Sequence, residues 1–125
     1  ANSYCYAHYA VAQKACDMGD VRTAKKYLAP IIDAEQLDYG IKSSVTGDRM
    51  LLRVGAFDLI VRINLAIAES KKESNTGKDI ARSKHYMRKA KEYLSRALAE
   101  YPDDPILLRL ADEIENNGSS EVPAN

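Results

Sequence analysis

The stretch AKKYL at residues 24–28 returns as AKEYL at residues 90–94, and these two copies decide the expected fold. Each copy continues with two dissimilar residues and then an apolar pair, Ile31-Ile32 in the first and Ala97-Leu98 in the second. Self-similarity of this kind is typical of helical repeats, in which one helical hairpin buries its apolar face only when a neighbour stacks on it. The repetition therefore predicts an all-α scaffold.

Apolar residues at helical spacing, bounded by Gly, Pro and Asp, predict about five antiparallel helices. The expected ranges are 3–18, 21–35, 48–72, 79–100 and 105–117. A turn-rich connection is expected over 36–47, and a mobile polar loop over 73–77. Pro30 lies inside the second helix, where a proline costs roughly 3 kcal/mol, so we expect a kink there or an end near Ala29.

The third expected helix is apolar on nearly every side, which predicts that it lies at the centre of the fold. Gly19 and Asp20 are expected to end the first helix and cap the second. Asp104 and Pro105 are expected to start the fifth helix. Together the helices predict one domain over 1–118, followed by a disordered tail over 119–125.

The composition is that of an ordinary globular domain, with 46% apolar residues, 29% charged residues and a formal net charge of zero. The charge is unevenly placed. Residues 78–96 carry seven Lys or Arg and two acids, a net charge of +5, whereas residues 97–125 carry one Arg and seven acids, a net charge of −6. Either two neighbouring helices partly neutralise each other, or the basic segment docks an acidic partner.

The two cysteines, Cys5 and Cys16, are separated by eleven residues of one expected helix, about 16 Å, so they cannot pair with each other there. The most apolar stretch, residues 50–68, contains four polar side chains and predicts no membrane span. The chain does not begin with Met, so both a cytoplasmic protein and one exported after signal cleavage stay open.

These residues resemble the tetratricopeptide repeats, helical hairpins with small residues at the close contacts, a Gly-Asp turn and a Pro after the second helix. The first copy of the motif carries Ala12, Gly19-Asp20, Ala24, Tyr27 and Leu28. The second copy carries Ala90, Tyr93, Leu94, Ala97 and Pro102. The resemblance implies a short right-handed superhelix with a C-terminal capping helix, and a non-catalytic module that binds a protein or peptide partner in a helical groove.

The third expected helix carries candidate partner-binding residues. Arg53 and Asn64 lie within about 20° of each other around its axis, with Arg49 nearby. An Arg fork suits a carboxylate, so these side chains are expected to hold an acidic group of a partner. On the opposite side, Asp58 and Arg62 are expected to form an ion pair between residues i and i+4.

The basic face of the fourth expected helix is the other candidate surface, and Lys78, Arg82 and Lys89 follow helical spacing there. An adaptor that binds nucleic acid through residues 78–96 is the alternative function. Exposed aromatic residues should then stand among the charges, but Tyr86 and Tyr93 fall on the inner face. An acidic protein partner is therefore favoured over nucleic acid.

Catalytic groups are sparse, and no enzyme activity, metal or cofactor is predicted. Cys5 and His8 share a helix face, but a structural zinc site needs four ligands. A second alternative is a helical ligand-binding or enzymatic domain that uses these two residues and the tyrosines Tyr4, Tyr6 and Tyr9. The small residues of the first helix also suggest a homo-oligomer interface.

Overall fold

A computed structural model of the chain describes residues 2–34, 40–42, 47, 49–74 and 76–121, with side chains from residue 5 to residue 116. Within these residues there are five helices and one pair of short strands. The elements are α1 (Asn2–Asp17), α2 (Val21–Asp33), β1 (Gly40–Lys42), β2 (Arg49–Leu51), α3 (Leu52–Ser74), α4 (Gly77–Glu100) and α5 (Pro105–Glu121). The described chain is mostly helical, so the all-α class is confirmed at this level.

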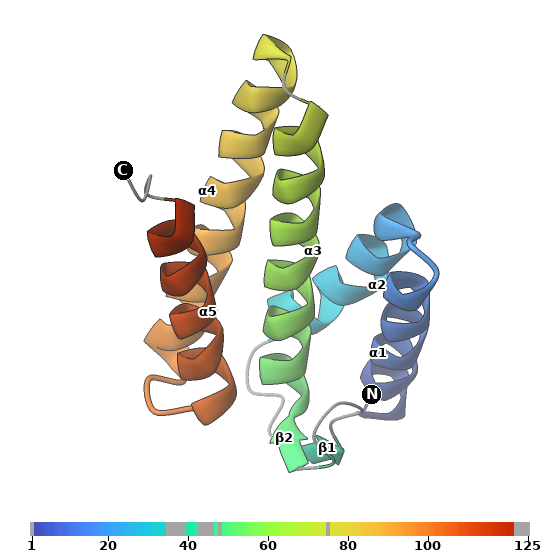
Figure 1. Cartoon of the computed structure of the whole chain (residues 1–125). Coiled ribbons are helices and arrows are strands. Elements are labelled where there is room, and N and C mark those ends of the chain that lie inside the picture. Colours follow the sequence, from blue (N-terminus) through green and yellow to red (C-terminus); the bar gives the residue numbers. More distant parts are fainter. Residues whose placement is uncertain (1, 35–39, 43–46, 48, 75, 122–125) are drawn as a thin grey trace.

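Helices α3 and α4 form a long central hairpin, with α1 and α2 on one side and α5 on the other (Figure 1). Helix α3 contacts all four other helices and the strand β2. The turn between α3 and α4 projects beyond the ends of α1, α2 and α5 (Figure 1). The prediction that the third helix is the centre of the fold is therefore confirmed.

The expected punctuation of the helices is confirmed at two turns. Gly19 has a φ of +77°, a conformation that glycine adopts without steric cost, and Asp20 accepts a hydrogen bond from the Thr23 amide at 3.2 Å. Asp104 accepts from the amides of Ile106 at 2.9 Å and Leu107 at 3.3 Å. These caps satisfy amides that have no partner inside their own helices.

The main correction concerns residues 40–51, where a short antiparallel hairpin replaces the expected loop and the start of the third helix. Ile41 pairs with Met50, and Lys42 pairs with Arg49. Ile41 of β1 is buried, and its burial stabilises the extended backbone of this strand. Helical periodicity in the sequence does not indicate such a strand. The rest of the expected connection, 36–39 and 43–46, lies outside the described residues.

Three helix boundaries also differ from expectation. The connection predicted over 73–77 is shorter than expected, because α3 runs to Ser74 and α4 begins at Gly77, where Thr76 caps it by accepting from the Asp79 amide at 3.1 Å. Helix α2 continues through Pro30 to Asp33, so the expected end near Ala29 is wrong. Helix α5 continues to Glu121, past the expected end at Asn117, and residues 122–125 lie outside the described part.

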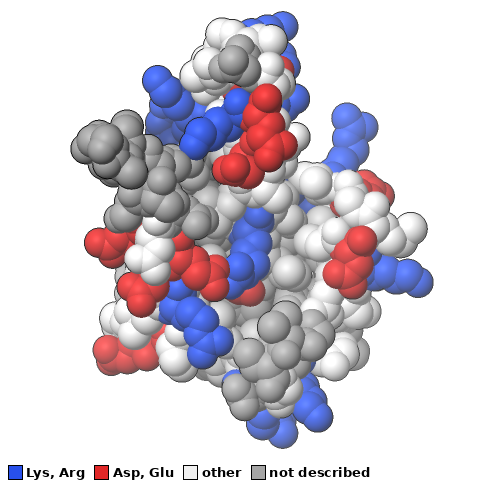
Figure 2. Space-filling view, viewed as in Figure 1, with Lys and Arg blue, Asp and Glu red and all other residues white. Residues whose placement is uncertain are grey.

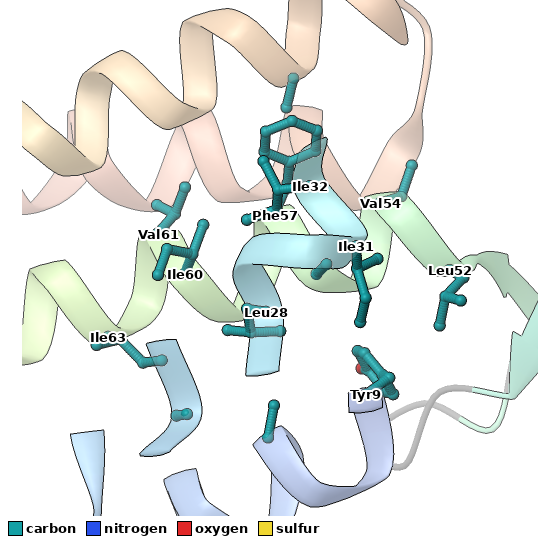
Figure 3. Packing of buried hydrophobic residues seen from close by; sticks show 14 of the residues in the cluster. Tyr9, Leu28, Ile31, Ile32, Leu52, Val54, Phe57, Ile60, Val61 and Ile63 are labelled. Atoms are coloured by element: carbon teal, nitrogen blue, oxygen red, sulfur yellow. The ribbon is translucent and has the colours of Figure 1, made fainter. Parts of the chain in front are cut away.

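The buried core takes side chains from all five helices, and part of it lies where α2 crosses α3. Figure 3 shows Leu28, Ile31 and Ile32 of α2 lying over the α3 side chains Phe57 and Ile60. Small buried residues allow the helices to approach closely, and Ala12, Ala24, Ala90 and Ala97 are all fully buried. Gly55 of α3 serves the same purpose, since a Cβ there would lie 3.1 Å from the Tyr9 ring and hydroxyl of α1.

Candidate functional site

Arg53 lies in the core, with a side chain only 2% exposed. Its guanidinium pairs with the Glu100 carboxylate, donates to the Tyr101 hydroxyl at 3.2 Å and donates to the Ile32 carbonyl at 2.6 Å. These bonds join the end of α2, the start of α3 and the end of α4. Arg53 thus ties three helices together and does not line an open groove, which corrects the predicted placement.

The other two residues predicted on the same face as Arg53 are also placed differently. Asn64 is 2% exposed and donates from Nδ2 to the Ile60 carbonyl at 2.8 Å. Arg49 is exposed on the strand β2, because the helix begins later than predicted. The structure therefore does not gather these three side chains into one groove.

Helix α4 carries exposed cations along two edges that lie roughly 130° apart around its axis. One edge contains the predicted residues Lys78, Arg82 and Lys89, and the other contains Lys84, Arg88 and Lys91. Each set faces a different neighbour. Lys78 and Arg82 lie near the projecting turn, where Arg82 pairs with Asp79 at 3.6 Å.

The edge with Lys84, Arg88 and Lys91 borders a groove of about 460 Å³ between the projecting halves of α3 and α4. We call it the α3–α4 groove, and its lining residues are Ala68, Glu69, Lys72, Ile80, Ser83, Lys84, Met87, Arg88 and Lys91. Ser83 joins the two helices at the groove by donating to the Ala68 carbonyl at 2.7 Å. The groove thus has apolar lining, four cations and one acid.

Lys89 on the other edge borders a smaller cleft of about 270 Å³ between α2, α3 and α4. We call it the α2–α4 cleft, and its lining residues are Lys25, Ala29, Ile32, Asp33, Ile60, Asn64, Lys89, Tyr93 and Arg96. Of the predicted binding residues, it brings together Asn64 and Lys89. Lys25 and Arg96 could not be assigned to it from sequence, because its walls form only when α2 packs beside α4.

Acidic and basic side chains gather on different parts of the outer surface. Figure 2 shows acidic side chains over α5 and Lys or Arg side chains around the projecting end of the α3–α4 hairpin. The bridges between α5 and its neighbours include Arg62 with Glu113 at 2.9 Å.

The predicted pair of Asp58 and Arg62 is confirmed, with Nε and Oδ1 3.1 Å apart. Burial raises the pKa of the Asp58 carboxyl above its usual range, Arg62 opposes that rise, and the neighbouring Glu113 and Asp104 add to it. The pair supports the packing of α5 on α3 and lies away from both hollows.

Helix α1 does not assemble a catalytic group within its described side chains. Cys5 and Tyr9 are buried, whereas Tyr6 is 53% exposed, and the Tyr4 side chain lies outside the described part. The ring of His8 lies 4.9 Å from that of Tyr27. Burial, with a smaller effect of Asp17, raises the pKa of the Cys16 thiol and keeps it from acting as a ready thiolate nucleophile.

No protein-family model matches the chain, and no curated protein or solved structure matches it significantly. Within the described ranges, no three His, Cys, Asp or Glu residues are grouped to hold a metal ion. None of the helices in the described part combines the length and the hydrophobicity needed to cross a bilayer.

Proposed function

We propose that this chain is a non-catalytic protein-interaction module, and that its α3–α4 groove binds an acidic amphipathic helix of a partner protein. The observation that carries the proposal is the combination of apolar lining and cationic rim in one open groove at the projecting end of the hairpin. Ile80 and Met87 supply apolar surface, and Ile80 is 38% exposed.

The rim selects the charge of the partner. Lys72, Lys84, Arg88 and Lys91 surround the groove, against the single carboxylate of Glu69, which leaves a net charge of +3. A helix with apolar anchors at i, i+4 and i+7 would place them on the groove lining and its acids against the rim. Complementary charge also speeds association and rejects basic segments. Methionine suits such a surface, because its flexible side chain adapts to varied anchors.

The arrangement of hairpins supports a divergent tetratricopeptide-like architecture as part of this proposal. Helices α1 and α2 are joined by the Gly19-Asp20 turn, α3 and α4 form the second hairpin, and α5 would be the capping helix. The fully buried Ala24 and Ala90 occupy equivalent places in the two copies of the repeated segment. The right-handed superhelix belongs to the same proposal.

The experiment is a fluorescence anisotropy titration with a labelled helical peptide that carries Leu anchors and otherwise Glu and Ala. A scrambled peptide of equal composition controls for charge alone. We expect saturable binding, weakened about tenfold or more by Lys84→Glu combined with Lys91→Glu. The matched control combines Arg22→Glu with Arg109→Glu, which makes the same charge change at exposed sites outside the groove.

Equal binding of the scrambled peptide, or equal weakening by both double variants, would overturn the proposal, because charge alone would then explain the association. A duplex or single-stranded oligonucleotide that binds the chain more tightly than the peptide, with a steep loss of affinity in salt, would move the function to nucleic acid.

A further inference from the structure

We propose that the α2–α4 cleft is a second binding site, and that it takes a phosphate monoester in its dianionic form. Cations reach this cleft from two helices, Lys25 from α2 and Lys89 and Arg96 from α4. The proposal does not rest on the α3–α4 groove, which lies along the opposite edge of α4 and has other lining residues.

Lys25 and Lys89 bring two positive charges close together at this cleft. No carboxylate among the described residues pairs with Lys25 or Lys89, although the Lys25 ammonium lies 5.1 Å from the centre of the Tyr86 ring. Burial lowers the pKa of Lys25, and the like charge of Lys89 lowers it further. An anion bound beside the two ammonium groups would offset both effects.

The third cation, Arg96, is held at the wall of the cleft. Its Nη2 donates to the Ile32 carbonyl at 3.3 Å and lies 3.8 Å from the Asp33 carboxylate, at the limit of an ion pair. Its guanidinium also lies over the Phe57 ring, 5.7 Å from the centroid. These contacts restrict the side chain, yet it is 48% exposed and keeps donors for a ligand.

The charge and size of the cleft select the ligand. Three cations and the one carboxylate of Asp33 leave a net charge of +2, which matches a phosphate monoester dianion better than a single carboxylate. A volume of about 270 Å³ holds a small molecule or one side chain, but not a helix. Ala29, Ile32 and Ile60 supply apolar wall for an organic group attached to the phosphate.

The test is isothermal titration calorimetry with phenyl phosphate, a heptapeptide that carries one phosphoserine, and benzoate as the monoanionic control. Phenyl phosphate represents a free monoester, and the peptide represents a phosphorylated side chain of a protein. We expect saturable binding of at least one phosphorylated probe, with benzoate bound about tenfold or more weakly. The probe that binds more tightly identifies the source of the phosphate.

Variants separate a built site from general attraction to a basic surface. Lys25→Gln combined with Lys89→Gln should weaken phosphate binding about tenfold or more, while Arg22→Gln combined with Arg109→Gln, the same charge change at exposed sites outside the cleft and the groove, should leave it within about twofold. Asp33→Asn should tighten binding, because it removes the carboxylate that competes for Arg96.

Three results would overturn the proposal: no saturable binding of either phosphorylated probe at millimolar concentration, equal affinity for benzoate, or equal losses in the two double variants. A thermal melt of each variant checks folding. None of these results bears on the acidic-helix proposal, which is tested with a different probe and with groove variants.

Discussion

The buried cation Arg53 and the two lysines of the α2–α4 cleft have opposite surroundings. Arg53 is buried and bonded to Glu100, Tyr101 and the Ile32 carbonyl, so its guanidinium holds three helices together. Lys25 and Lys89 face a cleft, and no carboxylate in the described residues pairs with them. Whether a cation is available to a partner therefore depends on the carboxylates and carbonyls that surround it in the fold.

The largest loss of stability is expected when the buried cation Arg53 is removed. Arg53→Ala should lower the free energy of unfolding by about 3 to 5 kcal/mol, because it removes a buried side chain, takes the cation from Glu100 and leaves the Ile32 carbonyl with only the longer bond from Arg96. Arg96→Ala, at a 48% exposed site, should cost less than about 1 kcal/mol. Urea denaturation of both variants measures the contrast, and equal losses would remove the distinction between the two cations.

A substitution at Gly55, two residues from Arg53, measures the effect of packing on stability without a change of charge. Gly55→Ala should destabilise by about 1 to 3 kcal/mol, since the added methyl meets the Tyr9 ring and hydroxyl at 3.1 Å and the Met50 methyl at 2.9 Å. The control is Gly77→Ala at the start of α4, where an added Cβ meets nothing within 4 Å. Thermal melts that place both variants near the wild type would show that α1 can move away from α3 at little cost.

Asp58 is an intermediate case, because its carboxylate is half-buried and pairs with Arg62 on the same helix. The other titratable groups that face it are Glu113 on α5, Asp104 just before α5 and Tyr9 on α1. Its pKa is raised above the usual 3.8, so the folded state binds the proton more tightly than the unfolded state. Its contribution to stability therefore rises as pH falls through the raised pKa and is unfavourable at neutral pH.

Replacement of Asp58 by Asn tests that sign. The Asp58→Asn variant should equal or exceed the wild type in stability at pH 7, by no more than about 1 kcal/mol, and the difference should vanish below the usual pKa of a carboxyl group. Urea denaturation of both proteins across this range measures it. A wild type that is clearly more stable than the variant at pH 7 would show that the ion pair with Arg62 outweighs the cost of burial.

The smallest expected effect is at Lys25, where the charge is unfavourable to the fold. Lowering of its pKa means that the folded state binds this proton less tightly, so stability is gained as pH rises through the lowered pKa. Lys25→Gln should change stability at pH 7 by only a few tenths of a kcal/mol, in the stabilising direction, about the size of other surface changes. A thermal melt that drops by several degrees would assign Lys25 a structural role.

Sequence reasoning succeeded where the information was local. Gly19, Asp20, Asp104 and the Asp58–Arg62 pair act within one or two helical turns, and each was found as expected. The apolar periodicity of α3 also sufficed to place that helix at the centre, because a helix that is apolar all round must be covered all round.

Reasoning from sequence failed where the outcome depended on contacts between distant segments. The hairpin of β1 and β2 is specified by the burial of Ile41 and by pairing across the turn, which helical periodicity does not report. Arg53 and Asn64 were expected on an exposed face of the helix, but both side chains are buried. The burial of Arg53 depends on the distant end of α4, which supplies Glu100 as its partner. Lys25 and Lys89 are 64 residues apart in the chain, so no local pattern could join them.

The central claim is that the two basic edges of α4 serve two different ligands. The most direct measurement is a pair of NMR titrations of the amide resonances, one with the acidic helical peptide and one with phenyl phosphate. We predict that the peptide shifts resonances around Ile80, Met87 and Lys91, and that phenyl phosphate shifts those around Lys25, Asn64 and Arg96. Shifts of one common set of residues by both ligands would contradict the account.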